Sequence, residues 1–282
     1  MSYGLFHCCL HWAILALVWC CLGGVVPQVL PAQEATDSFS IALALPGGTY
    51  FATADNLGNV YRITASNSLE KYAPDGRLLS GYSNNRLGKA TVLDVTNPLK
   101  TLAWYSEFRT VLFLDRSLTV LGELNLLQAG YPEVRTVASS RDGNLWIYDE
   151  VAFRLRKITP EGTQLYESQH LGQLFLDKIN MLGMKESDNR LYASVAGMGI
   201  FVFDAFAQFQ EQYLPEHPGE SFEVRQDVLY YTDSTNLYAE NMPLHQVQRT
   251  TLPAVAASGN RLNFAENRLL VWNPEVLYVL VK

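Results

Sequence analysis

Residues 134–168 decide the fold of this chain, and they read VRTVASSRDGNLWIYDEVAFRLRKITPEGTQLYES. Short runs rich in Val, Ile, Leu and Tyr, which favour strands, alternate here with turn sequences. The turns at Arg141-Asp-Gly-Asn144 and Thr159-Pro-Glu-Gly162 supply the positive-φ glycine and the preset proline φ that tight hairpins need. The stretch therefore predicts an antiparallel meander of four strands.

The same four-part pattern recurs along the chain. A second clear copy begins at Thr49 and has its turns at Asp55-Asn-Leu-Gly-Asn59 and Pro74-Asp-Gly76. Less regular copies begin near residues 99, 179, 221 and 261, so that all six starts lie 35 to 50 residues apart. Four short strands at a period near 40 residues are typical of one blade of a β-propeller.

We therefore expect an all-β, six-bladed propeller of four-stranded antiparallel blades with very little helix. The last copy has room for three strands before Lys282, and an unassigned strand at Ser38–Leu45 follows the N-terminal segment. That strand is predicted to complete the last blade and close the ring. Thr91–Asn97 falls outside the copies as an extra strand, which leaves five or seven blades open. A β-sandwich would show no such period.

The N-terminal segment has the pattern of a secretory signal. Residues from Cys8 to Val26 are almost wholly apolar, and a short Gly- and Pro-containing stretch leads to Ala32. We expect a signal peptide over 1–32 and a single propeller domain over 33–282. An uncleaved membrane anchor is the alternative, because the apolar run is nearly long enough to span a bilayer. A lipoprotein signal fits poorly, because Trp19 precedes Cys20.

The amino-acid composition favours some cellular locations and argues against one class of partner. All four cysteines lie before residue 33, so the predicted mature chain has no disulfide and must be held by packing. No N-x-[ST] acceptor occurs, which favours bacterial export to the periplasm, the outer membrane or the cell exterior. The net charge of -7 argues against nucleic acid, whose binding depends on Lys and Arg at phosphates.

The repeated phrase resembles that of a known propeller superfamily. Asp55-Asn-Leu-Gly-Asn-Val-Tyr61 and Asp142-Gly-Asn-Leu-Trp146, each followed by Pro-[Asp/Glu]-Gly, look like the NHL-type and quinoprotein-like (WD40-like) propellers, especially exported bacterial members. The resemblance covers Ser38 to Lys282. It implies a ring with a polar-lined channel and loop-built faces, but it says little about activity, since the superfamily includes lactonases, lyases, sensors and scaffolds.

The residues contain no recognisable catalytic motif. The histidines after residue 33 are His170, His217 and His245, and none has metal-ligand spacing to another His or Cys. No nucleophile elbow or phosphate loop occurs. Acidic residues recur at the predicted turns, and in six-bladed hydrolases such carboxylates hold Ca²⁺. Because they follow the repeat, we interpret them as turn caps. These residues are Asp55, Asp75, Asp142, Asp149, Asp188, Asp204, Asp227 and Asp233.

The aromatic side chains divide into two groups. Six are predicted to occupy equivalent strand positions and to pack between blades: Tyr61, Trp104, Trp146, Tyr192, Tyr230 and Trp272. Longer loops at 82–86, 169–175 and 212–219 break the repeat, and loops on a rigid scaffold are where binding usually occurs. The candidate partner-binding residues on these loops are Tyr82, Asn85, Arg86, His170, Phe175, Tyr213 and His217.

These observations favour an exported, non-catalytic propeller that binds a protein or peptide partner, or another ligand, in the bacterial cell envelope. It is expected to be monomeric, to need no cofactor and to touch the membrane only through an uncleaved N-terminal segment. The alternative is a Ca²⁺-dependent, lactonase-like hydrolase or lyase acting on a small ester or sugar. That enzyme would need a convergent acidic cluster, which a single sequence does not reveal.

Overall fold

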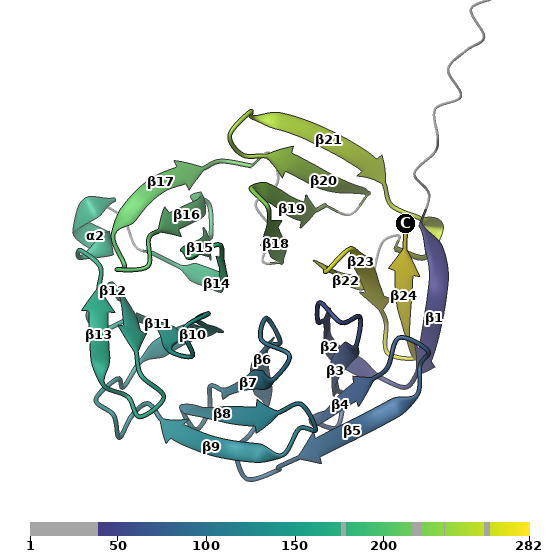
Figure 1. Ribbon diagram of the computed structural model, residues 1–282, viewed down its shortest axis with the longest axis horizontal. Coiled ribbons are helices and arrows are strands. Elements are labelled where there is room, and N and C mark those ends of the chain that lie inside the picture. The colour runs from purple at the N-terminus through teal and green to yellow at the C-terminus, as the bar shows by residue number, and fades with distance from the viewer. Residues whose placement is uncertain (1–38, 176–178, 216–220, 234, 257–259) are drawn as a thin grey trace, which may run out of the picture. The chain divides into compact units, whose positions relative to one another are not determined.

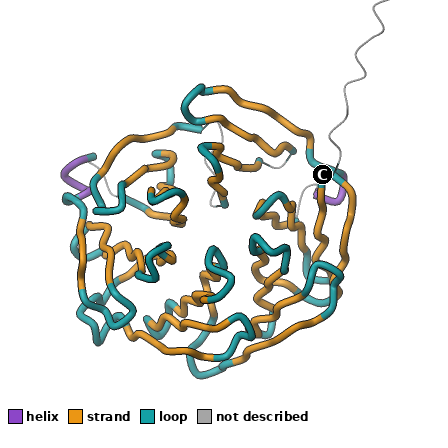
Figure 2. Tube along the Cα trace, in the orientation of Figure 1, coloured by secondary structure: helices purple, strands orange, loops and turns teal. Residues whose placement is uncertain are grey.

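The computed structural model describes residues 39–175, 179–215, 221–233, 235–256 and 260–282. These residues form a ring of six four-stranded antiparallel sheets, the blades, with very little helix (Figures 1 and 2). The predicted fold class and blade number are therefore confirmed. The proposed signal segment, 1–32, lies outside the described residues.

In each blade the strands follow one another from the channel to the rim, so we call them first to fourth strand. Blade 1 is β2 (Thr49–Ala54), β3 (Val60–Thr64), β4 (Ser68–Tyr72) and β5 (Leu78–Ser83); blade 2 is β6 (Ala90–Asp94), β7 (Lys100–Tyr105), β8 (Thr110–Asp115) and β9 (Val120–Asn125); blade 3 is β10 (Val134–Ser139), β11 (Leu145–Asp149), β12 (Arg154–Ile158) and β13 (Gln164–Glu167). Blade 4 is β14 (Met181–Ser187), β15 (Arg190–Val195), β16 (Gly199–Phe203) and β17 (Phe209–Tyr213); blade 5 is β18 (Phe222–Arg225), β19 (Val228–Thr232), β20 (Asn236–Asn241) and β21 (Gln246–Thr251); blade 6 is β22 (Arg261–Ala265), β23 (Arg268–Trp272), β24 (Val276–Val281) and β1 (Ser40–Pro46).

The N-terminal strand closes the ring, as the sequence predicts. β1 pairs antiparallel with β24, from Ser40 opposite Val281 to Pro46 opposite Val276. The chain thus supplies the fourth strand of blade 6 from its other end (Figure 1). Because backbone hydrogen bonds join the two ends of the domain, the circle is held without a disulfide.

The predicted start of blade 2 near Leu99 is wrong. The first strand of that blade is β6, which pairs with β7 from Ala90 opposite Tyr105 to Asp94 opposite Leu102. The stretch 91–97, which the sequence analysis sets aside as an extra strand, therefore contains the channel strand of blade 2. The connection from β6 to β7 has five residues, as in blades 1 and 3, but it lacks the glycine that marks the turn in those two blades, and the hairpin therefore went unrecognised.

The ring has two faces. Each first strand turns into its second, and each third into its fourth, on what we call the hairpin face. Each second strand turns into its third, and each blade leads into the next, on the opposite linker face. Because the strands form antiparallel meanders, a residue near the start of any first strand lies near the linker face.

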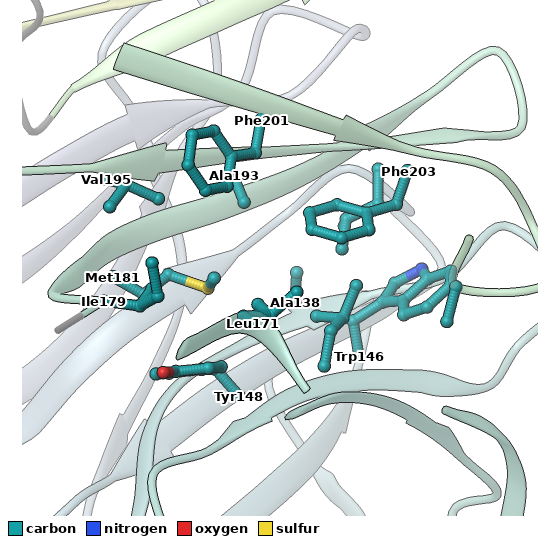
Figure 3. Packing of buried hydrophobic residues seen from close by; sticks show 13 residues of the cluster. Ala138, Trp146, Tyr148, Leu171, Ile179, Met181, Ala193, Val195, Phe201 and Phe203 are labelled. Atoms are coloured by element: carbon teal, nitrogen blue, oxygen red, sulfur yellow. The ribbon is translucent and has the colours of Figure 1, made fainter. Parts of the chain in front are cut away.

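The core is divided into six apolar clusters, one at each junction between neighbouring blades. Figure 3 shows the cluster between blades 3 and 4, where Trp146 and Tyr148 of β11 face Phe201 and Phe203 of β16. Both rings of β11 are fully buried. The blades are thus held together by packing, and none of the described residues is a cysteine.

A buried carboxylate joins the same two blades. Glu186 of blade 4 is 7% exposed and accepts three hydrogen bonds from blade 3. Its Oε2 accepts from Ser140 Oγ at 2.6 Å and from Trp146 Nε1 at 2.5 Å, and its Oε1 accepts from Arg141 N at 2.8 Å. A buried carboxylate needs such partners, because an unpaired one is costly.

The aromatic side chains pack between blades as predicted, but not all six occupy equivalent strand positions. Tyr61, Trp146, Tyr192 and Tyr230 pair with equivalent residues of their first strands. The pairing places Trp104 and Trp272 two residues further along their strands. Of the six side chains, Tyr230 alone is half-buried, and the other five are buried.

Helix is confined to two short segments of the described chain, α2 (Leu171–Leu174) and a 3-10 turn at Ala254–Ala256. Both belong to connections between blades. Among the described residues, no helix is long and apolar enough to pass through a membrane.

Candidate functional site

The first strands of all six blades surround a central cavity of about 720 Å³. Residues from every first strand contribute to its wall, and the lining mixes apolar side chains with hydroxyl, amide and charged groups. Cavities of several hundred Å³ with a few polar groups on a rigid scaffold are typical of small-molecule sites. The channel is therefore the candidate site.

A belt of polar side chains lines this channel, at equivalent positions of the first strands. We define the belt by strand pairing, as the first-strand residues that lie opposite Tyr61, Leu102, Trp146, Tyr192, Tyr230 and Leu270 of the second strands. Those residues are Thr53, Asp94, Ala138, Lys185, Glu223 and Asn263. Five of the six are polar, and those five line the cavity. The residue that follows each of them along the strand lies close to the hairpin face.

Hydrogen bonds tie the belt to neighbouring blades. Asp94 Oδ2 accepts from the Ser139 backbone N at 2.7 Å, while its Oδ1 accepts from the Thr96 backbone N at 2.9 Å. Asn263 Nδ2 donates to the carbonyl of Ala52 at 3.0 Å across the blade 6 to blade 1 junction. These side chains hold blades together while presenting polar edges to the cavity.

The charged pair of the belt joins blades 4 and 5. Lys185 Nζ donates to Glu223 Oε2, and the Glu223 side chain is 6% exposed. Burial raises the pKa of the Glu223 carboxyl, while the Lys185 ammonium acts in the opposite direction. Because each charge has its partner within the protein, this pair is a structural link that also shapes the cavity wall.

At the linker face, blades 6 and 1 form an aromatic and cationic wall of the channel. The Arg261 guanidinium lies 5.5 Å from the centre of the Tyr50 ring, and its Nη1 donates to the Tyr50 carbonyl at 3.2 Å. Next to it, the rings of Phe51 and Trp272 meet edge to face at 6.3 Å. No carboxylate of the described residues forms an ion pair with Arg261. The guanidinium has five N–H donors, so it can bind an anionic group of a ligand in addition to the Tyr50 carbonyl.

The recurring aspartates cap turns. Asp55 Oδ1 accepts from the backbone N of Leu57 at 3.0 Å and of Asn59 at 2.8 Å, and Asp204 makes the same pair of bonds to Phe206 and Gln208. Asp75, Asp142, Asp149 and Asp233 likewise accept from backbone N–H groups of their own turns. Asp188 and Asp227 occupy positive-φ turn positions. Within the described part of the chain, no group of three His, Cys, Asp or Glu side chains is placed to hold a metal ion.

Three of the candidate partner-binding residues lie at the junction of blades 1 and 2. The Tyr82 ring packs against the cluster between these blades, and its hydroxyl accepts from Asn84 Nδ2 at 3.0 Å. Asn85 and Arg86 follow on the exposed side of the same connection, where the Arg86 backbone N donates to Asn84 Oδ1 at 2.9 Å. These three form a local group.

Three more lie at other junctions. His170 caps α2 by accepting from Gln173 N at 3.1 Å through Nδ1, and its ring stacks on Phe153 at 5.3 Å. Phe175 stacks on Phe201 at 4.1 Å, within the core between blades 3 and 4. Tyr213 ends β17, and His217 lies outside the described residues. The candidates are therefore spread over several blade junctions, and their binding of a partner stays a prediction.

Sequence reasoning missed the belt and Arg261. Asp94 fell in the stretch that was set aside as extra, while Lys185, Glu223 and Asn263 carried no motif. A usable signal was present, because each polar belt residue lies within two residues of the last paired residue of its first strand. Aligning the six first strands on their hairpins would have revealed it.

Known structures resemble this chain in fold, but no curated protein matches it by sequence. No protein-family model matches the chain, and no curated protein matches it. The chain is similar in structure to virginiamycin B lyase from Staphylococcus aureus, with a TM-score of 0.60, 12% identity, and coverage of 87% of this chain and 100% of that one.

Two further structures show the same likeness. A streptogramin B lyase has a TM-score of 0.56 and 16% identity, covering 84% of this chain and 82% of that one. A catalytically inactive histidine-to-alanine variant of the S. aureus virginiamycin B lyase, solved with quinupristin, has a TM-score of 0.54 and 14% identity, covering 87% and 85%. At such identities the likeness concerns the fold, and the chain has the six-bladed β-propeller fold of these lyases.

Proposed function

We propose that this protein is a non-catalytic binding propeller of the bacterial cell envelope that holds a peptide or small polar ligand in its central channel. The observation that carries the proposal is the polar belt. Its charged groups are already bonded to neighbouring blades, so they are suited to orient a ligand by hydrogen bonds rather than to transfer protons. Location in the envelope rests on the N-terminal sequence pattern.

The wall at the linker face indicates what the ligand carries. Arg261 offers a cation above an aromatic surface, and Asp94 offers a carboxylate on the belt. A peptide or zwitterionic small molecule has matching groups of both signs, and its apolar part can contact Phe51 and Trp272. Binding through a few polar groups above apolar contacts needs no reacting residue.

A lyase is the second candidate, because the structural neighbours are streptogramin B lyases. One of them is inactive when a histidine is changed to alanine. In this chain His170 and His245 lie outside the channel lining, on α2's N-cap and in the turn between β20 and β21. The lyase function is favoured by the shared fold alone. The binding function is favoured by the channel lining, which contains neither His170 nor His245.

One preparation distinguishes the two functions. The full-length sequence is expressed in a bacterium, and the processed protein is recovered by cell fractionation and its N-terminus determined. Native mass spectrometry then identifies retained ligands, and quinupristin is incubated with the protein with and without Ca²⁺ or Mg²⁺. Three outcomes together support the proposal. The protein is recovered from the envelope fraction with its N-terminus near residue 33, it retains a ligand that the Arg261→Gln variant loses, and it leaves quinupristin unchanged. Metal-dependent cleavage of quinupristin would replace it with the lyase function.

A further inference from the structure

A second cavity of about 670 Å³ lies between blades 5 and 6. Tyr230 and Phe264 form its floor, with ring centres 5.0 Å apart, and Leu237 adds an aliphatic surface. Glu266 is the one lining residue that this groove shares with the channel. The groove is therefore a distinct surface that the proposed channel function does not use.

Three basic side chains line the groove, against a single carboxylate side chain. Arg225 ends β18, Arg268 begins β23, and Lys282 follows β24, so strand direction places all three toward the hairpin face. Their excess over Glu266 stands out in a chain whose net charge is -7. A local excess of positive charge beside an apolar surface favours an anion with an apolar neighbour.

Arg225 and Arg268 both keep N–H donors that a ligand can use. The Arg225 Nη1 atom is 3.8 Å from Glu266 Oε2, its Nη2 donates to Asn267 Oδ1, and its guanidinium lies 5.8 Å from the Tyr230 ring centre. Arg268 Nη1 donates to the backbone carbonyl of Glu266 at 3.2 Å, and no ion pair to Arg268 occurs among the described side chains. Each guanidinium has five N–H donors, so both can still bind a carboxylate.

We propose that this groove binds an acidic peptide segment, with a carboxylate between Arg225 and Arg268 and a neighbouring aromatic or aliphatic side chain on the Tyr230–Phe264 floor. Charge complementarity selects the acidic group, and the apolar floor selects against a bare inorganic anion. Gln248 and Thr250, alternate residues of the edge strand β21, line the groove and offer an amide and a hydroxyl to the peptide backbone.

The test uses the full chain and three probes. The first is the peptide Gly-Phe-Asp-Phe-Gly with both ends blocked, the second replaces its Asp with Asn, and the third is inorganic phosphate. Binding is measured by calorimetry at low and high salt. We expect the Asn peptide to bind about tenfold more weakly than the Asp peptide, since the carboxylate supplies charge-assisted hydrogen bonds. High salt should also weaken the Asp peptide.

Three groove variants and one control variant locate the binding. Arg268→Gln should weaken the Asp peptide about fivefold, and Arg268→Lys should restore part of the loss. Arg225→Gln is the third groove variant and should also weaken the Asp peptide, because the proposal places the carboxylate between Arg225 and Arg268. Arg77→Gln is the matched control, because it removes the same charge from a side chain that is 71% exposed on another blade.

Equal affinities for the Asp and Asn peptides would overturn the proposal, as would unchanged binding in Arg268→Gln. Phosphate binding as tight as the Asp peptide would also overturn it, because the apolar floor would then contribute nothing. Loss of binding in the channel variant Arg261→Gln with retention in Arg268→Gln would place the peptide in the channel instead.

Discussion

Glu186→Ala should be among the most destabilising substitutions in this protein, although Glu186 lines neither the channel nor the groove. The change removes one carboxylate and leaves the donors of Ser140, Arg141 and Trp146 without their acceptor. The Ser140 hydroxyl can rotate, whereas the backbone N–H of Arg141 and the indole N–H of Trp146 cannot. Each buried orphan costs about 1 to 3 kcal/mol, so we expect a loss of about 3 to 5 kcal/mol in the free energy of unfolding.

The assay is urea denaturation of the full chain at neutral pH, followed by tryptophan fluorescence, with Glu186→Gln and Glu133→Ala as comparisons. Glu186→Gln keeps an acceptor oxygen and should lose less than Glu186→Ala. Glu133 pairs with Arg109 at 2.8 Å, but its side chain is 55% exposed, so its loss should cost less than about 1 kcal/mol. A Glu186→Ala protein as stable as Glu133→Ala would refute the argument that this carboxylate joins blades 3 and 4.

Two further predictions concern turns. Gly76 and Gly143 have φ of +86° and +85°, but an added Cβ would lie 2.5 Å from Leu43 Cδ1 at Gly76 and would meet nothing within 4 Å at Gly143. Gly143→Ala therefore measures backbone strain alone, and Gly76→Ala should lower the melting temperature further; equal shifts would show that Leu43 yields freely. Burial acts to raise the pKa of the Asp142 carboxyl, but hydrogen bonds led by that from Lys157 hold it at about 2. Because this pKa lies below the unfolded value, Asp142 stabilises the fold above about pH 4 and loses that effect as pH falls toward 2, which a comparison of acid unfolding with Asp142→Asn checks; identical acid profiles would contradict it.

Function has to be argued from the channel and the groove, because the fold supports both binding and catalysis. The structural neighbours show that a ring of this kind can be a lyase. In this chain, the belt carboxylates Asp94 and Glu223 accept hydrogen bonds from neighbouring blades. A carboxylate engaged in this way can position a ligand group, whereas general base catalysis requires one within reach of the proton it removes.

The repeat and its turns made the architecture predictable. Asp142-Gly143 and Pro160-Glu161-Gly162 occur where the structure places hairpins, and both glycines have positive φ. The spare strand near the N-terminus was correctly assigned to blade 6, because the last copy lacked one strand. These are local signals, since a tight turn depends on the backbone freedom of its own residues.

Blade 2 shows where local signals fail. β6 has an ordinary strand sequence, but the connection from Asp94 to Lys100 lacks the glycine turn that marks blades 1 and 3. Its assignment as a first strand depends on pairing with β7. Pairing is a property of two segments together, so no single turn sequence reports it.

The sequence by itself determined the all-β class, the six blades and the closure of the ring, because period, turn chemistry and strand propensity act over a few neighbouring residues. Only the tertiary structure decided which side chains share the channel and the groove. Asp94, Lys185 and Glu223 line the channel from three blades, and Arg225 and Arg268 line one groove from blades 5 and 6. Such residues are distant along the chain, and they become neighbours only because strand register and ring closure set the position of every first strand.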